Sequence, residues 1–240
     1  MNKIILAIVC VMVSLSGICQ EKYKDAFKVN LSALVAKNIS VQYERKISKR
    51  LSVALGYRNL PYGTIPFETA ISNKVNSSSV DFTKLLVGSN AITPELRWYV
   101  GKKGAMRGFY MAPFGSFANY KSEFPISFSN RSGIFKGSMK ASTAGIQFGS
   151  QFRLASRFYL DWWIIGPNIG NGKGNLDFNA DAPLNPNEQS ALSDQIAKLK
   201  KDLPIDFIST YTVDASGAKI VLDGPWAGLR GLGFCLSFHF

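Results

Sequence analysis

The sequence is poor in the residues that most often build catalytic and metal sites. It has one histidine, His239, and three cysteines, of which Cys10 and Cys19 lie near the N-terminus and Cys235 near the C-terminus. With Cys235 alone after position 19, that part of the chain has no internal disulfide. His239 is the penultimate residue, a poor position for a catalytic triad or a metal site, which need a histidine held among partners. We therefore expect no catalytic residue, no metal and no cofactor, and a protein that is not an enzyme.

Long apolar runs are also missing, except at the N-terminus. Residues 4–15 form an apolar run after Lys3, and Gly17 and Cys19 supply the small residues of a cleavage site. The run is shorter than the about 20 residues that a spanning helix needs. We expect residues 1–19 to be a secretory signal peptide and residues 20–240 to be one domain. If the exported chain stays in a membrane, it must do so as a closed β-barrel, because no later run suits a helix.

Acidic residues are scarce relative to basic ones. The chain has 16 Asp and Glu against 28 Lys and Arg, a formal net charge of +12. A basic surface on an exported protein favours contact with phosphate-bearing lipid or polysaccharide over nucleic acid. We therefore expect contact with membrane lipid, including phosphate-bearing glycolipid, and no nucleic-acid partner. The composition does not identify any surface partner.

Alternation of apolar and polar residues is the dominant pattern in the rest of the chain. The closing stretch GLRGLGFCLSFHF, Gly228–Phe240, places Leu and Phe side chains on one face and small or polar ones on the other. A terminal strand of this kind has one face suited to hydrocarbon and one that tolerates water. A similar alternation occurs from Ile39 to Ser48 and from Leu51 to Leu60.

The same pattern predicts eight strands. Their approximate bounds are 27–35, 39–48, 51–60, 91–100, 108–120, 140–154, 158–169 and 228–240. Links after the second, fourth and sixth strands are short, and those after the third, fifth and seventh are long, at 61–90, 121–137 and 170–227. Short turns on one rim and long loops on the other are typical of outer-membrane barrels. We predict an all-β fold: an eight-stranded antiparallel up-and-down transmembrane β-barrel.

Two features of the predicted strands depart from a regular pattern: prolines inside them and the facing of the fifth strand. Pro94, Pro113 and Pro167 fall inside predicted strands, where each removes a ladder hydrogen bond, so we expect bulges or strand ends there. The facing of the fifth strand is open, because both of its faces are apolar or aromatic.

The last long link has structure of its own. Asn185 is a candidate N-cap, Pro186 suits the first helical position and Glu188 completes a capping box. Packing against the barrel mouth or binding a partner would each explain the apolar stripe of this short helix, formed by Leu192, Ile196, Leu199 and Leu203. The stretch FISTYTVDASGAKIVLDG then predicts a hairpin that extends the barrel wall. Earlier in the link, GNGKGN lacks the spacing of a phosphate-binding loop and is expected to be a flexible loop.

One segment carries a family resemblance. In PELRWYVGKKGAMRGFYMAPFGSFANY, Pro94 to Tyr120, a Pro-Glu-x-Arg-aromatic-Tyr run is followed by a short basic turn and a Gly-Phe-Tyr strand. This combination resembles a family of small Gram-negative outer-membrane β-barrel proteins of unassigned function, over the whole chain after the signal peptide. The resemblance implies an eight-stranded barrel in the cell outer membrane, assembled by the barrel-insertion machinery. It implies no activity.

Charged residues recur on the face assigned to the barrel interior. Paired carboxylates can act as acid and base, but unpaired charges in a narrow barrel are costly, so mutual salt bridges are the simpler interpretation. We predict a structural charge cluster made of Glu44, Lys46, Arg58, Glu95, Arg97, Arg153 and Asp161.

The sequence leaves two functions open. The first is a structural or surface-interaction role in the outer membrane, which an interior filled by the charge cluster would favour. The second is a conduit or binding site for a small apolar ligand, which a wide interior lined by aromatic residues would favour. A soluble lipocalin-like carrier would turn its apolar face inward, and the outward Phe and Trp residues oppose it.

Overall fold

The computed structural model describes residues 23–64, 84–128, 131–202 and 207–240. The predicted signal peptide lies outside the described residues. No helix within them is long and apolar enough to cross a membrane. The strands are β1 Asp25–Asn30, β2 Ile39–Lys46, β3 Leu51–Thr64, β4 Leu86–Tyr99, β5 Gly108–Phe128, β6 Arg131–Arg153, β7 Phe158–Ala180, β8 Ile208–Asp214 and β9 Gly217–His239, and the helices are α2 Leu31–Val35 and α4 Pro186–Asp202.

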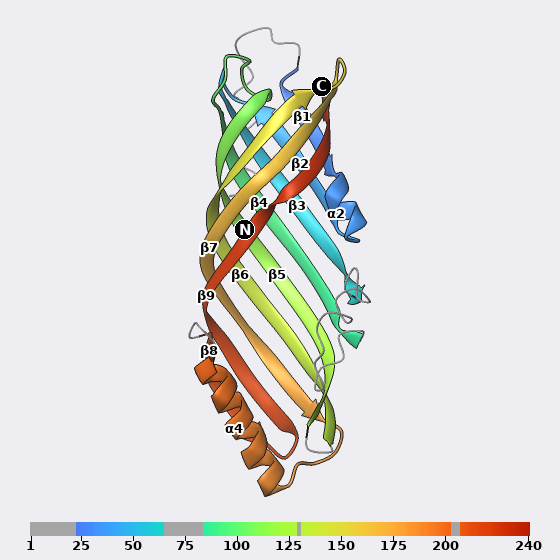
Figure 1. Cartoon of the computed structure of the whole chain (residues 1–240), viewed down its shortest axis with the longest axis vertical. Coiled ribbons are helices and arrows are strands. Elements are labelled where there is room, and N and C mark those ends of the chain that lie inside the picture. Colours follow the sequence, from blue (N-terminus) through green and yellow to red (C-terminus); the bar gives the residue numbers. More distant parts are fainter. Residues whose placement is uncertain (1–22, 65–83, 129–130, 203–206) are drawn as a thin grey trace, which may run out of the picture.

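Eight of these strands form an antiparallel ring (Figure 1). The strands pair in the order β1-β2-β3-β4-β5-β6-β7-β9, and β9 returns to pair with β1. Strand β8 adds to β9 outside the ring, and with β9 it forms the predicted hairpin after the helix. The all-β antiparallel fold and its eight ring strands agree with the prediction.

The strands differ in length around the ring. Strands β1 and β2 have 6 and 8 residues, whereas β5, β6, β7 and β9 have 21 to 23. The long strands continue downward in Figure 1 as a projecting sheet, made of 119–128, 131–140, 171–180 and 217–223 together with β8. Much of what was predicted as long loops, 121–137 and 170–227, is therefore strand. The error arises because the outward face turns polar there while backbone pairing continues.

The glycines of GNGKGN lie within β7, so the prediction of a flexible loop is wrong. At Gly174 a Cβ atom would collide with the carbonyl of Ser138 on the neighbouring strand. Glycine is thus needed there for the close approach of two backbones.

The ring closes along only part of β9. Strand β1 pairs with β9 from Asn30 and Cys235 to Ala26 and His239. It ends at Asn30, whose Oδ1 accepts a hydrogen bond from the backbone N–H of Ala33 at 3.0 Å and caps α2. The prediction of a strand continuing to Val35 is therefore wrong. Among the described residues, 224–233 of β9 pair with β7 alone.

Alternating burial establishes which side chains point inward. On β5, Tyr110, Ala112 and Phe114 are buried, while Phe109 and Phe117 are exposed on the outer surface. This resolves the facing that the sequence left open. The end of β9 alternates as predicted: the side chains of Phe234 and Leu236 are exposed, and those of Cys235, Ser237 and His239 are buried.

The three prolines do not end their strands, so the prediction of strand ends is wrong. A bulge is present only near Pro167, where the register of β6 with β7 shifts between Phe148 and Gly149. Strands β4, β5 and β7 run through Pro94, Pro113 and Pro167, and all three prolines are exposed on the outward face. Pairing of β4 with β5 lapses at Pro94 and resumes in the same register. The register of β4 with β5 is thus kept across Pro94, whereas that of β6 with β7 shifts by one residue near Pro167.

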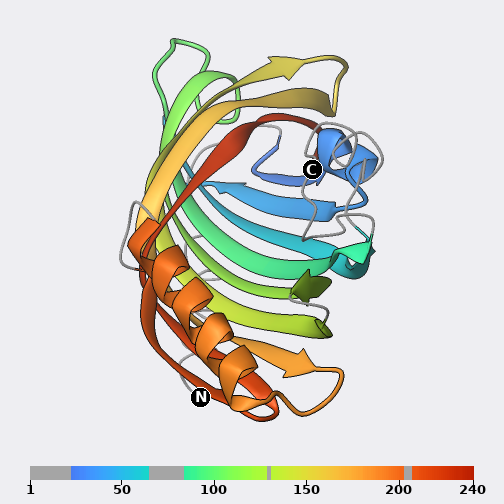
Figure 2. The same ribbon diagram turned by 60° about the horizontal axis from the view of Figure 1, so that its bottom comes forward.

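Helix α4 begins with the predicted capping box. The backbone N–H of Asn185 donates to Glu188 Oε2 at 2.8 Å, and the N–H of Glu188 donates to Asn185 Oδ1 at 2.9 Å. Figure 2 shows α4 along β8 and β9. Its described apolar side chains, Leu192 and Ile196, pack in a small core at the far end of the projecting sheet, whose other buried members are Phe135, Phe178, Leu184, Ile208, Ala218 and Ile220. Leu203 lies outside the described residues.

Candidate functional site: the interior of the ring

One end of the interior is filled by charged side chains. This end lies at the turn rim, the rim with the short turns 47–50, 100–107 and 154–157. Three cations face three carboxylates there, so their formal charges cancel. All are fully buried except Arg230, whose side chain is 18 % exposed. We call this set the ionic cluster: Lys28, Glu44, Glu95, Arg97, Asp161 and Arg230.

Arg97 is the centre of the ionic cluster. Its Nη1 lies 2.7 Å from Asp161 Oδ2 and 3.2 Å from Glu44 Oε2, and its Nε lies 2.9 Å from Glu95 Oε2. The remaining Nη2 donates to Gln42 Oε1 at 2.7 Å. One guanidinium thus contacts all three carboxylates, an arrangement that its planar fork of five donors allows.

Lys28 completes the pairing on one side of the cluster. Its Nζ lies 2.5 Å from Asp161 Oδ2 and also bridges to Glu44 Oε2. Strand β1 supplies this lysine between the outward residues Phe27 and Val29. Glu44 on β2 and Asp161 on β7 are separated in the ring by β1 and β9, and both Lys28 and Arg97 link them.

Neutral side chains satisfy the remaining oxygens. The hydroxyl of Tyr99 donates to Glu44 Oε1 at 2.6 Å, and that of Tyr110 donates to Asp161 Oδ1 at 2.9 Å. Gln151 Nε2 donates to Glu44 Oε2 at 2.8 Å. A buried ion pair is tolerable only when its remaining hydrogen-bonding capacity is met in this way.

Arg230 forms the boundary of the cluster. It pairs with Glu95 Oε1, and its guanidinium carbon lies 3.9 Å from the centroid of the Trp163 ring and 5.4 Å from that of Phe114. These aromatic faces hold the cation by cation–π attraction. Beyond Arg230 the interior opens.

The structure brings together four of the seven residues predicted for the charge cluster: Glu44, Glu95, Arg97 and Asp161. Lys46 and Arg153 lie at the turn rim, and Arg58 lies in the hollow part of the interior. The only sequence signal for the other members of the network is that each occupies an inward position in the alternation of its strand. Six of them were not predicted from the sequence: Lys28, Gln42, Tyr99, Tyr110, Gln151 and Arg230.

His239 is inside the ring and buried near the turn rim. Its ring stacks on Tyr159, with centroids 3.7 Å apart and an interplanar angle of 11°. Within the described part of the chain, no group of three or more His, Cys, Asp or Glu side chains is placed to hold a metal ion. The histidine therefore has a packing contact that accounts for its position.

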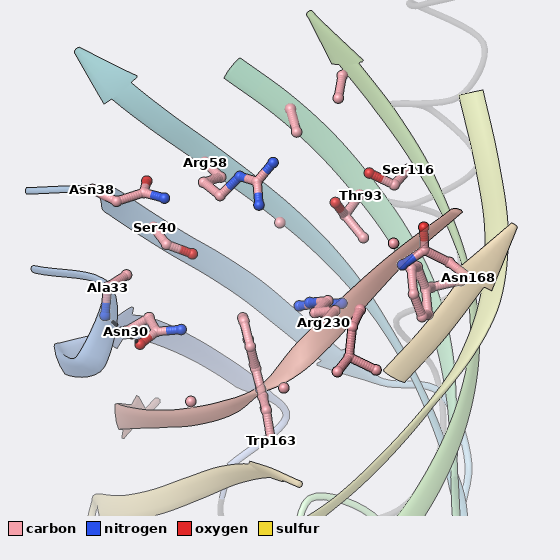
Figure 3. A pocket seen from close by; sticks show the side chains of 18 of the residues that line it. Asn30, Ala33, Asn38, Ser40, Arg58, Thr93, Ser116, Trp163, Asn168 and Arg230 are labelled. Atoms are coloured by element: carbon pink, nitrogen blue, oxygen red, sulfur yellow. Dashed lines mark hydrogen bonds between the residues drawn. The ribbon is translucent and has the colours of Figure 1, made fainter. Parts of the chain in front are cut away.

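The interior next to Arg230 is a polar cavity of about 370 Å³ (Figure 3). It is hollow because the inward positions of successive strands hold small residues. One register row across five strands shows this: Ser40, Arg58, Ala91, Ala118 and Ala141. Arg58 is the one long side chain in that row.

A second, apolar cavity of about 590 Å³ continues from the polar one toward the projecting sheet. The two share Asn38, Arg58, Tyr120 and Trp226. The apolar lining of the second cavity includes Leu60, Val87, Phe124, Met139, Leu176 and Leu222. From the turn rim outward, the interior therefore passes from charged and filled, through polar and hollow, to apolar.

Arg58 differs from the arginines of the ionic cluster. Within the part of the chain that the structure describes, its buried Nε has no hydrogen-bond partner, and neither has the Oδ1 of Asn38. No Asp or Glu is among the described residues that line either cavity. Figure 3 shows the guanidinium directed into the polar cavity from β3, with Arg230 entering from β9.

Together these features define a class of protein: an antiparallel ring of eight strands with a neutralised ionic cluster at one end of its interior and a cavity at the other. A family model described as a protein of unknown function, DUF3575, matches residues 4–172. The chain belongs to that family. The match ends within β7, before α4 and β8. Searches of curated proteins and of solved structures each gave no match.

Proposed function

We propose that the ring is a transmembrane β-barrel of the Gram-negative outer membrane, with a structural or surface-interaction role and no catalytic activity. The observation that carries this proposal is an apolar belt on the outer surface. Every ring strand contributes exposed apolar side chains to it, including Phe27, Ile39, Leu55, Ile92, Leu96, Phe109, Phe117, Ile146, Phe152, Ile165, Phe234 and Leu236. A contiguous apolar surface of this extent needs hydrocarbon or a partner to cover it.

The length of the belt suits a bilayer. On β5 the outward apolar residues run from Phe109 to Phe117, and on β7 from Phe158 to Ile169. These stretches are close to the about 9–11 residues with which a tilted strand crosses the hydrocarbon core. Near the turn rim the belt begins with Trp98, Phe109 and Phe158, as expected for an aromatic girdle at a lipid interface.

The belt also has a defined polar border. The outward face changes from apolar to polar along one register row that crosses six strands: Asn59, Asn90, Asn119, Lys140, Lys173 and Asp223. Within this row, Asn119 Nδ2 donates to Asn90 Oδ1, and Lys173 Nζ pairs with Asp223 Oδ2, each at 2.9 Å. Polar pairs at this position suit the lipid headgroups and the water beyond them.

The interior favours a structural role over a conduit. The ionic cluster fills the turn-rim end with side chains that are all paired, so a solute would have to break buried salt bridges to pass. The projecting sheet, with its own small core and α4, is the part that would extend into water and meet a surface partner. The basic residues outside the cluster suit phosphate-bearing lipid on either side of the belt.

Cell fractionation tests the proposal. The protein should be found in the outer membrane, need detergent for extraction and migrate differently on gels before and after boiling. Release as a soluble periplasmic protein would contradict it.

A matched pair of substitutions on β6 tests the belt itself. Ile146→Arg places a charge in the belt and should destabilise the inserted protein by about 2–4 kcal/mol, whereas Ser138→Arg lies beyond the polar border and should change stability by no more than about 0.5 kcal/mol. Both residues are exposed on the outward face. Equal effects of the two changes on unfolding in lipid would exclude the proposed membrane position.

A further inference from the structure

The two cavities and Arg58 suggest a ligand. We propose that the interior binds an anionic amphiphile, whose carboxylate or phosphate head meets Arg58 and whose hydrocarbon part lies in the apolar cavity. The proposal rests on the membrane function above only for the route by which the ligand enters. The binding site itself follows from the lining residues.

The first argument is the missing counterion. Arg97 and Arg230 are each paired with carboxylates, whereas among the described residues Arg58 faces none and its buried Nε has no partner. A buried donor left unsatisfied is costly, and an unpaired cation more so. The guanidinium fork matches the oxygens of a carboxylate or a phosphate. A ligand anion at this position would supply what the chain lacks.

The second argument is the change of polarity on either side of Arg58. On the polar side, Ser40, Thr93 and Ser116 offer hydroxyl groups in the same cavity as the guanidinium (Figure 3). On the other side, Tyr120 and Trp226 lead into the apolar cavity. A molecule held with its charge at Arg58 would therefore place its head among hydroxyls and its hydrocarbon among apolar side chains.

The third argument is access from the bilayer. Residues 224–233 of β9 have no strand partner on the β1 side among the described residues, so the wall is interrupted beside α2. Leu229 and Leu232 line the polar cavity here and are 70 % and 77 % exposed. Leu31 and Val35 of α2 are also exposed. An opening bordered by apolar side chains lets a hydrocarbon chain pass at lower cost than a polar one would.

Tryptophan fluorescence provides a test. Trp163 and Trp226 line the cavities, whereas Trp98 and Trp162 lie on the outward face, where Trp162 stacks on Phe234. In a Trp98→Phe/Trp162→Phe background, the remaining fluorescence reports on the interior. The full chain in lipid nanodiscs is titrated with bromine-labelled stearic acid, and bromine-labelled stearyl alcohol is the neutral control. Lysophosphatidic acid and inorganic phosphate are added separately as competitors.

The acid should quench in a saturable manner, with an affinity at least about tenfold above that of the alcohol. Arg58→Gln should remove the difference in affinity between acid and alcohol. Arg58→Lys should retain most of that difference, and the control Arg153→Gln, at the turn rim, should retain all of it. Lysophosphatidic acid should compete if the head site accepts phosphate. Inorganic phosphate should not compete, since it lacks the hydrocarbon part.

Three results would overturn the proposal: equal affinities for acid and alcohol, Arg58→Gln binding as well as Arg153→Gln, or full displacement by inorganic phosphate. Each variant is checked for the gel shift on boiling. A protein that shows the shift and does not bind contradicts the ligand while leaving the membrane function intact. A protein that is not in the outer membrane contradicts the function instead.

Discussion

The two ends of the ring interior differ in how their buried charges are neutralised. At the turn rim, Arg97 contacts three carboxylates and every formal charge of the ionic cluster is cancelled. In the cavity, Arg58 has a buried nitrogen without a partner and no carboxylate in the described lining. The same residue type, on neighbouring strands, is a structural element at one end and a candidate ligand-binding group at the other.

The difference arises from the size of the inward residues along each strand. On β4, Arg97 and Tyr99 fill the turn-rim end, while Ala91 leaves space further along. On β5 the change is from Tyr110 to Ala118. Large polar side chains seal one end, and small ones keep the other hollow. Charge in a sealed region must be neutralised by the chain, whereas charge beside a cavity can be neutralised by a ligand.

Among the substitutions considered, loss of Arg97 should lower the stability of the ring the most. Arg97→Met removes the cation that the three carboxylates share, leaving them with Lys28 and Arg230. We expect the free energy of unfolding in lipid, measured by urea titration, to fall by about 3–5 kcal/mol. The matched control is Arg153→Gln at the exposed turn rim, which should change it by no more than about 0.5 kcal/mol. Similar values for the two variants would show that the cluster does not hold the ring together.

A double-mutant cycle on Glu95 and Arg230 examines the border between the two regions. Glu95→Gln should cost about 1–3 kcal/mol, because it leaves Arg230 and one side of Arg97 without a charged partner. Adding Arg230→Gln should cost less than the sum of the two single changes, with a coupling of about 0.5–3 kcal/mol. Strict additivity would mean that the pair makes no energetic contact.

Two alanines on the inward face of β5 compare the packing of the two ends directly. Ala112 is 0 % exposed and packs in a small apolar core with Tyr99, Tyr110 and Trp163 beside the ionic cluster, and Ala118 lines the polar cavity. Ala112→Phe should overpack the sealed end and cost about 1–3 kcal/mol. Ala118→Phe points into space and should cost no more than about 0.5 kcal/mol. The reverse order in urea unfolding would show that the cavity is in fact packed.

The sequence predicted the strands of the ring well wherever one face is apolar. Alternation located the end of β9 and the outward Phe234 and Leu236, because burial of one face requires a period of two. It failed from Lys121 to Phe128 and from Arg131 to Met139, which pair over their whole length. The outward side chains described there are mostly polar. Backbone pairing without an apolar face leaves little trace in the residue pattern.

Local and long-range chemistry also differed in predictability. The capping box of α4 depends on residues three positions apart, so the sequence contained it completely. The partners of Glu44 are not close to it in the sequence. Lys28 and Tyr99 lie on other strands, and only the register of the closed ring brings them together with Glu44. The alternation along each strand predicts which side chains point into the ring. It does not predict which inward side chains of different strands lie at the same level along the ring axis, because that depends on the register between strands.

Thiol accessibility tests most directly whether one end of the interior is sealed and the other open. Cys235 lies in the sealed end and is 1 % exposed. In folded protein with Cys10 and Cys19 removed or replaced by serine, a hydrophilic maleimide should leave Cys235 unlabelled until the chain is unfolded. Ala118 is only 6 % exposed but lines the polar cavity, so Ala118→Cys, in a Cys235→Ser background, should be labelled in the folded state. Labelling of native Cys235 as fast as Ala118→Cys, or protection of both thiols, would contradict this division of the interior.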